Sequence, residues 1–118
     1  MITDLIELQK KAHEQSANAG WWDDDYSGTY TLVPIKLALI HSEISEALEA
    51  HRKTLMDDKL PDMPGLQVEL ADAVIRILDL AEFMGYNITE AINRKMLYNE
   101  IRADHSRSAR ASEHGKKY

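Results

Sequence analysis

Hydrophobic residues recur along this chain at the three- and four-residue spacing of amphipathic helices. The spacing predicts four helices, over about residues 4–19, 32–55, 66–84 and 87–101, and the alternation typical of strands is scarce,. Helices that each bury an apolar stripe against their neighbours form a bundle. The sequence therefore predicts an all-α bundle of four helices.

Residues that begin and end helices stand at the borders of these segments. Gly20 follows the first helix, and Asn87 with Glu90 three residues later resembles a capping box at the start of the fourth,. Residues 21–30 form a loop with two tryptophans and three consecutive aspartates, and residues 57–65 form a loop with two prolines and a glycine,. We place the helix boundaries at these loops.

A chain of 118 residues has the size of one domain and can bury a core without staples,. We expect one helical domain over residues 1–105 and a basic C-terminal tail over residues 106–118 that becomes ordered on contact with a ligand or another subunit,.

The absence of cysteine excludes disulfides, thiolate zinc sites, iron–sulfur clusters and a thiol nucleophile,. Without a membrane-length apolar run or a signal peptide, a cytoplasmic protein is expected,.

Charge is distributed unevenly along the chain. Residues 1–93 contain 7 basic and 17 acidic side chains, whereas residues 94–118 contain 7 basic and 3 acidic ones. The acidic body argues against binding to a nucleic-acid polymer. A ligand that combines cations with phosphates would suit both parts, although a basic tail is more often only a solvated end.

The glutamates of the second helix fall on two faces when residues are placed 100° apart. Glu49 lies on the polar face with Ser42 and Ser45. Glu43 and Glu46 lie beside the apolar stripe, and their spacing places both carboxylates on one side of the helix,. These two carboxylates are therefore the ones placed to reach a neighbouring helix.

The third helix is apolar on nearly every side and should be largely buried,. Four of its charged residues nevertheless share a band about 80° wide. They are Glu69, Asp72, Arg76 and Asp79. If the second and third helices pack antiparallel, as a connection of about ten residues allows, the two inner glutamates of the second helix face Glu69 and Asp72.

Four carboxylates at one place repel one another at neutral pH, and a single arginine cannot offset them. A divalent cation can, and all-oxygen ligation suits Mg²⁺, with Mn²⁺ as a substitute. The predicted metal ligands are Glu43, Glu46, Glu69 and Asp72. In the alternative without metal, Arg76 pairs with Asp72 or Asp79, while the two glutamates of the second helix lie at a helix edge.

The spacing of these acids resembles a known signature. Glu43-x-x-Glu46, a gap of 22 residues and Glu69-x-x-Asp72 are similar to the metal-binding motif of the MazG-like all-α nucleoside triphosphate pyrophosphohydrolases, whose relatives include dimeric dUTPases and dCTP pyrophosphatases. The likeness covers nearly the whole chain, through "ALIHSEISEALEA", "VELADAVIRILDLAEFMG" and "RKMLYNEIR" in the family's order. The resemblance implies a four-helix MazG-like bundle that binds Mg²⁺.

A second set of residues resembles the family on its phosphate-binding side. Lys95, Asn99 and Arg102 match a Lys-x-x-x-Asn-x-x-Arg motif. The run "HGKK" at residues 114–117 resembles a terminal His-Gly-Gly-Lys segment that closes over phosphates, with Lys116 in place of the second glycine.

The chain departs from the family where Ser42 replaces a frequent second acid. It also lacks the aromatic residue that some dCTP-specific relatives carry after the acidic motif of the second helix, so the resemblance does not imply a cytosine preference.

The resemblance implies hydrolysis of a nucleoside triphosphate, expected to be a deoxynucleotide, to a monophosphate and pyrophosphate. The chemistry suits the site, because Mg²⁺ neutralises phosphate oxygens and lowers the pKa of a coordinated water. Glu46 is the predicted general base toward this water. Lys95, Arg102 and Lys116 would stabilise the phosphate charge, and Arg76 is a further predicted substrate contact,.

The base-binding side is predicted from residues near the end of the first helix. Trp22 is expected to stack on the base, since related sequences place an aromatic residue at this end of the site,. Trp21 is at least as well explained as a cap on the core. His13 is expected to hydrogen-bond the base, with a structural histidine as an equal alternative,.

Two other classes of protein stay open. A ferritin-like di-iron protein needs Glu-x-x-His, and no glutamate of this chain has histidine three residues on,. A non-catalytic helical interaction module would use the same carboxylates only to pair with arginines. Magnesium-dependent release of pyrophosphate separates the enzyme from this module.

The apolar third helix also predicts assembly, because four helices can hardly cover every side of it. We expect a homodimer or a tetramer built from dimers, and the resemblance implies active sites close to the subunit interface. Neither a membrane nor a nucleic-acid polymer is an expected partner.

Overall fold

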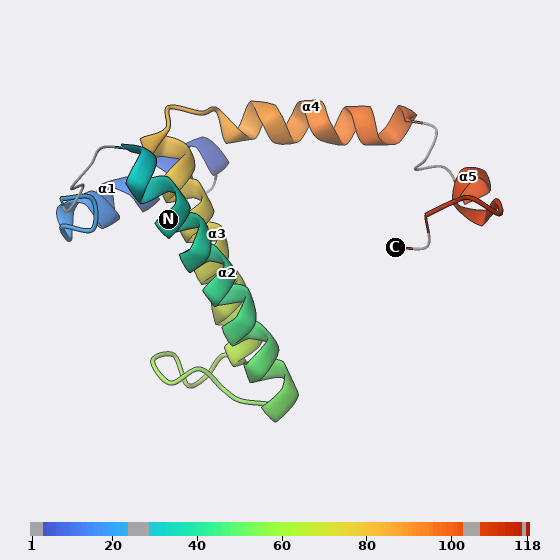
Figure 1. The fold of residues 1–118 in the computed structure, drawn as a ribbon. Helices are drawn as coiled ribbons and strands as arrows, with labels where there is room; N and C mark the ends of the chain where they lie inside the picture. Colours follow the sequence, from blue (N-terminus) through green and yellow to red (C-terminus); the bar gives the residue numbers. More distant parts are fainter. Residues whose placement is uncertain (1–3, 24–28, 103–106, 117) are drawn as a thin grey trace. The chain divides into compact units, whose positions relative to one another are not determined.

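The computed structural model describes residues 4–23, 29–102, 107–116 and 118. The helices in this part of the chain are α1 (Leu5–Asn18), α2 (Thr29–Lys53), α3 (Gly65–Phe83), α4 (Ile88–Ile101) and α5 (Arg107–Ala111) (Figure 1). β-type pairing within the described residues is confined to an isolated bridge between Met56 and Pro64. The predicted all-α class is confirmed. None of the described helices is both long and apolar enough to cross a membrane.

The predicted helix boundaries lie within a few residues of the observed ones. Asn87 caps α4, where its side chain accepts a hydrogen bond from Glu90 N at 3.0 Å, as the capping box predicts,. Gly20 follows α1 with φ of 89°, a left-handed conformation that glycine adopts without strain,. α2 starts at Thr29, three residues before the predicted start, so Pro34 lies beyond its first turn.

The chain divides into two compact units, Met1–Tyr86 and Asn87–Tyr118. In the first unit α2 and α3 run antiparallel, and α1 packs against α3 (Figure 1). Small buried residues occur on all three helices, among them Ala12, Ala47, Ala50, Ala73 and Ala81. Alanine at a helix contact permits a short distance between the axes, which brings the acidic side chains of α2 within reach of α3.

The connection between α2 and α3 is tied to the end of α2. Leu55 donates its backbone N–H to Ala50 O at 2.9 Å, and Gly65 donates to Leu55 O at 2.8 Å. A Cβ atom on Gly65 would lie 3.0 Å from Ala50 Cβ and 3.1 Å from Leu55 O, so glycine permits an approach that a larger residue would disturb,. The contact fixes where α3 starts, and with it the register of the α3 acids against those of α2.

The second unit contains α4 and the short α5. No residue of α4 is buried, although the helix carries an apolar stripe that includes Ile92, Met96 and Ile101. Of the predicted four-helix bundle, the structure shows the packing of α1, α2 and α3. α5 lies in the predicted tail, whose predicted border at residue 105 falls outside the described residues.

Candidate metal centre

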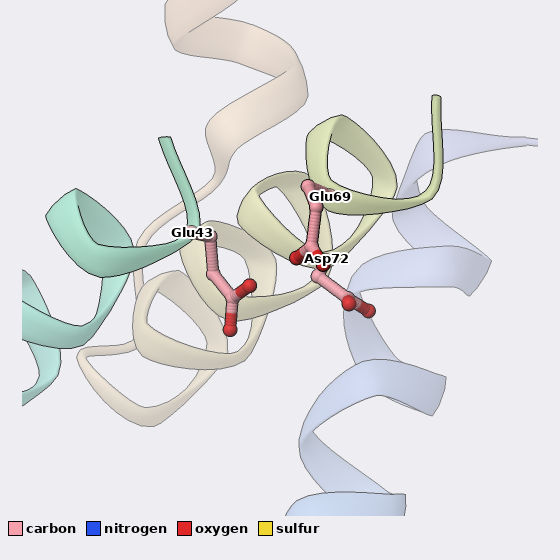
Figure 2. Close-up of side chains that lie close together, drawn as sticks. All are labelled: Glu43, Glu69 and Asp72. Atoms are coloured by element: carbon pink, nitrogen blue, oxygen red, sulfur yellow. The ribbon is translucent and has the colours of Figure 1, made fainter. Parts of the chain in front are cut away.

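Three carboxylates from two helices converge in the first unit. Glu43 projects from α2, and Glu69 and Asp72 project from α3 (Figure 2). One oxygen of each carboxylate lies within 4.8 Å of the others. The antiparallel packing of α2 and α3 thus brings together three of the four predicted metal ligands.

Two oxygens of this cluster are buried and meet no hydrogen-bond donor in the described part of the chain. Glu43 is 7% exposed, and its Oε1 accepts a hydrogen bond from Arg76 Nε at 2.8 Å, but its Oε2 meets no donor among the described residues. Oε2 of Glu69 is likewise buried and meets no donor in the part of the chain that the structure describes. A buried acceptor left unpaired costs about 1–3 kcal/mol, and more when it is charged. These oxygens therefore favour a bound cation or a proton.

The pKa values of the three carboxyl groups are shifted in different directions. Burial, together with hydrogen bonds to Glu43 and Glu46 and the charges of these neighbours, raises the pKa of Glu69 to about 8,. Burial and the charge of Glu43 also raise the pKa of Asp72 against the opposing effect of Arg76. Burial disfavours the ionised form of Glu43, but hydrogen bonds from Arg76 and Glu69 outweigh it and lower the pKa of Glu43. Near neutral pH, the metal-free cluster thus keeps a proton on Glu69.

Glu46, the fourth predicted ligand, is exposed and lies outside the group of oxygens that converge within 4.8 Å. Its carboxyl group is nevertheless close enough to those of Glu43 and Glu69 to influence the pKa of each. It also lines a pocket of about 220 Å³ together with Glu69 and the buried Asp57. Glu46 therefore borders the cluster from its more solvent-accessible side.

Arg76 pairs with Glu43, rather than with Asp72 or Asp79 as the alternative without metal supposes. Glu43 also belongs to the buried residues and does not lie at an exposed helix edge. One guanidinium faces three carboxylates, so the cluster carries excess negative charge whenever Glu69 or Asp72 ionises,.

A pocket of about 340 Å³ adjoins the cluster. Glu43, Asp72 and Arg76 contribute to its lining, and so do Asp79 and Trp21. Trp21 is 69% exposed, which argues against the reading of this residue as a cap on the core. The pocket therefore joins the convergent carboxylates to an exposed aromatic ring.

Trp22 and His13 are both held by Asp79. Oδ1 of Asp79 accepts hydrogen bonds from Trp22 Nε1 at 2.9 Å and from His13 Nδ1 at 2.8 Å, so Nδ1 carries the proton of the imidazole in this bond,. The Trp22 ring stacks on Phe83 with 4.0 Å between centroids, and Lys36 Nζ lies 4.4 Å from the Trp22 centroid. These contacts occupy the faces of the ring that the sequence predicts as the stacking surface for a base.

Asp79 is the residue of this site whose contacts the sequence analysis missed. It lies two helical turns after Asp72, on the same face of α3, and this position in the charged band was the available signal,. Its two partners are 57 and 66 positions away along the chain. No local pattern reports contacts at such separations.

The predicted phosphate-binding residues lie in the second unit. Lys95 is exposed, and Asn99 is half-buried with an Oδ1 that has no hydrogen-bond partner in the described chain. Arg102 is the C-cap of α4. The backbone oxygen of Lys116 accepts a hydrogen bond from Arg110 Nε at 3.3 Å. These residues thus belong to α4 and to the segment that follows it.

No protein-family model matches the chain, and no curated protein or solved structure is similar enough to count as a match. Its function is therefore inferred from the sequence motifs of the chain and from the geometry of its own residues.

Proposed function

We propose that this chain is a Mg²⁺-dependent nucleoside triphosphate pyrophosphohydrolase, which converts a nucleoside triphosphate, expected to be a deoxynucleotide, to the monophosphate and pyrophosphate. The convergence of Glu43, Glu69 and Asp72, with two buried oxygens that meet no donor in the described chain, carries this proposal. The resemblance of the acidic and Lys-x-x-x-Asn-x-x-Arg motifs to the MazG-like family supports it. The role would be control of a nucleotide pool or removal of damaged nucleotides.

The donor set fits a hard divalent cation. Carboxylate oxygens suit Mg²⁺ and Mn²⁺, and Mg²⁺ keeps coordination positions for water and substrate phosphates. Glu43, Glu69 and Asp72 would hold the ion, with Glu46 at the border as the fourth ligand. When bound, the ion would neutralise phosphate oxygens and lower the pKa of a coordinated water.

Glu46 is the proposed general base, since its carboxylate is exposed beside the cluster and can accept a proton from the attacking water,. The water oxygen forms a bond to the α-phosphorus. The bond from that phosphorus to the bridging oxygen breaks, and pyrophosphate leaves with its electron pair. The proposed contacts on the phosphate side are Arg76, Lys95, Asn99, Arg102 and Lys116,.

We further propose a homodimer or a tetramer of dimers, in which α4 completes a four-helix MazG-like bundle. α3 exposes large apolar residues, including Leu70 at 48% and Val74 at 46%. α4 exposes Met96 at 62% and Ile101 at 76%. A helix of 14 residues is marginally stable by itself in water, so its apolar stripe supports packing against further helices,.

A second candidate function is a non-catalytic helical interaction module. The ion pair between Arg76 and Glu43 at 2.8 Å favours it, because such a module would use arginines in place of a metal. The pair neutralises one carboxylate of three, and it leaves Oε2 of Glu69 buried without a donor among the described residues. We therefore prefer the metal-dependent enzyme.

Release of pyrophosphate from a panel of ribo- and deoxynucleoside triphosphates separates the two candidates. The enzyme should act on at least one triphosphate with Mg²⁺, stop in EDTA and recover with excess Mg²⁺ or Mn²⁺. Glu43→Gln keeps an acceptor for Arg76 but removes the charge, and it should lower the rate about 100-fold or more. No pyrophosphate from any triphosphate would favour the module.

A further inference from the structure

Asp79 is a buried carboxylate that lines the pocket without belonging to the metal cluster. It is 8% exposed and shares the lining of the pocket of about 340 Å³ with Glu43, Asp72 and Arg76. It is not one of the three residues whose oxygens converge within 4.8 Å. The pocket has the volume of small-molecule sites, and Asp79 supplies it with a hydrogen-bond acceptor.

Both hydrogen bonds that Asp79 accepts within the described chain go to the same oxygen. Oδ1 takes the N–H of His13 at 2.8 Å and that of Trp22 at 2.9 Å. Trp22 is itself fixed by stacking on Phe83. These contacts hold the carboxylate in one orientation, so Oδ2 is the oxygen left to accept a hydrogen bond from a ligand.

An exposed indole lines the same pocket. Trp21 is 69% exposed, and its backbone oxygen accepts a hydrogen bond from Lys36 Nζ at 3.0 Å, which ties this residue to α2. Aromatic rings bind nucleobases by stacking, and stacking tolerates every base. Discrimination between bases in this pocket must therefore come from polar atoms that meet the edge of the base.

We propose that Asp79 is a specificity-determining residue, whose Oδ2 accepts a hydrogen bond from the exocyclic amino group of a nucleobase stacked on Trp21. This inference rests on the proposed function, because it supposes that the adjoining carboxylates bind the metal and the triphosphate. Cytosine, adenine and guanine carry an amino group, whereas uracil and thymine present carbonyl oxygens in its place. A carboxylate that faces a carbonyl leaves two acceptors unpaired, so the pocket selects against uracil and thymine.

Asp79→Asn tests this assignment, because it exchanges an acceptor for a donor with little change in shape. His13 and Trp22 still require the oxygen of the amide, so the amide nitrogen takes the place of Oδ2 and donates to a carbonyl,. We expect the wild-type kcat/KM for dCTP to exceed that for dUTP about tenfold or more. Asp79→Asn should lower this ratio by at least about tenfold.

Glu82→Gln is the matched control. Glu82 is another acid of α3 that accepts a hydrogen bond from an α1 side chain, Gln9 Nε2 at 3.3 Å, but it does not line the pocket. This variant should keep the wild-type ratio of dCTP to dUTP. Trp21→Ala should raise KM for both nucleotides by a similar factor, because stacking does not depend on the identity of the base.

An active Asp79→Asn variant with an unchanged ratio would overturn the assignment, and so would equal losses for both nucleotides, because a merely structural carboxylate affects both alike. If wild type hydrolyses no triphosphate, the proposed function fails, and equilibrium binding of dCMP and dUMP decides the assignment. Tighter binding of dCMP that is lost in Asp79→Asn supports it. Equal binding of the two monophosphates, or binding of neither, refutes it.

Discussion

Arg76 donates a hydrogen bond from Nε to Oε1 of Glu43 at 2.8 Å and leaves Oε2 of the same carboxylate buried in the cluster with Glu69 and Asp72. Burial opposes ionisation of Glu43, yet the arginine helps to keep its pKa low, whereas burial and the neighbouring glutamates raise the pKa of Glu69 to about 8. Near neutral pH one glutamate is charged and the other holds a proton. A cation that binds here has to displace the proton of Glu69.

The thermal stability of the metal-free protein should fall as the pH rises from about 5 to about 9. Glu69 has a pKa of 4.5 in the unfolded chain and of about 8 in the folded one, so between these values the folded chain holds one more proton,. The free energy of unfolding therefore decreases with rising pH, and this contribution of Glu69 is lost above its folded pKa. Calorimetry in EDTA across this range measures the effect.

Glu69→Gln is the control for this prediction, because it removes the titrating group and should flatten the dependence. Below the raised pKa of Glu69, the affinity for Mg²⁺ should increase by up to about tenfold per pH unit, since the ligand has to lose its proton,. A Tm of the metal-free protein that rises with pH over the same range would contradict the raised pKa of Glu69.

Glu46→Gln and Asp72→Asn should each lower pyrophosphohydrolase activity by about 100-fold or more, with unchanged helix content by circular dichroism. Removal of a charge from the acidic cluster relieves repulsion, so the Tm of Asp72→Asn in EDTA should equal or exceed that of wild type. Glu49→Gln is the control. Its carboxylate is 45% exposed and pairs with Lys53 at 2.7 Å, so the variant should keep its activity and lose no more than about 0.5 kcal/mol of stability,. Equal losses of activity from Glu46→Gln and Glu49→Gln would contradict the assignment of the site to the face of α2 that carries Glu43 and Glu46.

Local signals in the sequence account for most of the helices. The predicted segments 4–19 and 66–84 differ by one residue at each end from Leu5–Asn18 and Gly65–Phe83, because apolar spacing and helix ends are local properties,. The start of α2 was placed three residues late, since Pro34 is a strong signal for a first turn,. The five residues of α5 are too few to show a periodic pattern,.

Helix geometry predicted that Glu43, Glu69 and Asp72 meet, but it also placed Glu46 among them, and it did not predict which partners these acids take. The spacing of 100° per residue placed Glu43 on the side of α2 that faces the α3 acids. Its hydrogen bond with Arg76 depends instead on the tertiary distance between the two helices. Trp21 and Trp22 are neighbours of the same type, so sequence reasoning had no means to tell the exposed ring from the packed one. That difference depends on Asp79, which lies 57 positions beyond the packed tryptophan.

Gly65→Ala should lower the free energy of unfolding by about 1–3 kcal/mol, because its Cβ would press on Ala50 and on the backbone of Leu55,. The displacement also shifts the start of α3, so activity should decrease together with stability. Gln67→Ala, an exposed position in the same turn, should change stability by less than about 0.5 kcal/mol,. Urea unfolding measures both variants, and equal stabilities for the two would exclude a tight contact at Gly65.

Light scattering at micromolar concentration should give the mass of a dimer or a tetramer of the 13.5 kDa chain. Met96→Glu combined with Ile101→Glu places charges on the exposed apolar stripe of α4 and should lower this mass,. Arg94→Ala, at a position 80% exposed, should leave it unchanged. A monomer mass for wild type would rule out the proposed assembly.

Deletion of residues 112–118 should raise KM for the nucleotide severalfold, because the tail contributes Lys116 to the phosphate contacts,. The ordering of the tail on the nucleotide costs conformational entropy. Because the deletion acts on KM, the loss of rate should be largest at low substrate concentration. Metal binding and oligomer mass should stay unchanged. Unaltered kinetics would show that the tail is a basic end with no part in the site.

Hydrolysis in ¹⁸O-labelled water, followed by ³¹P NMR on a mixture of nucleoside triphosphates with Mg²⁺, tests the central claim most directly. Attack by water on the α-phosphorus should give equal amounts of nucleoside monophosphate and pyrophosphate, with the label in the monophosphate and no turnover in EDTA. Release of orthophosphate, label in the pyrophosphate or no turnover of any triphosphate would contradict a metal-dependent pyrophosphohydrolase built on Glu43, Glu69 and Asp72.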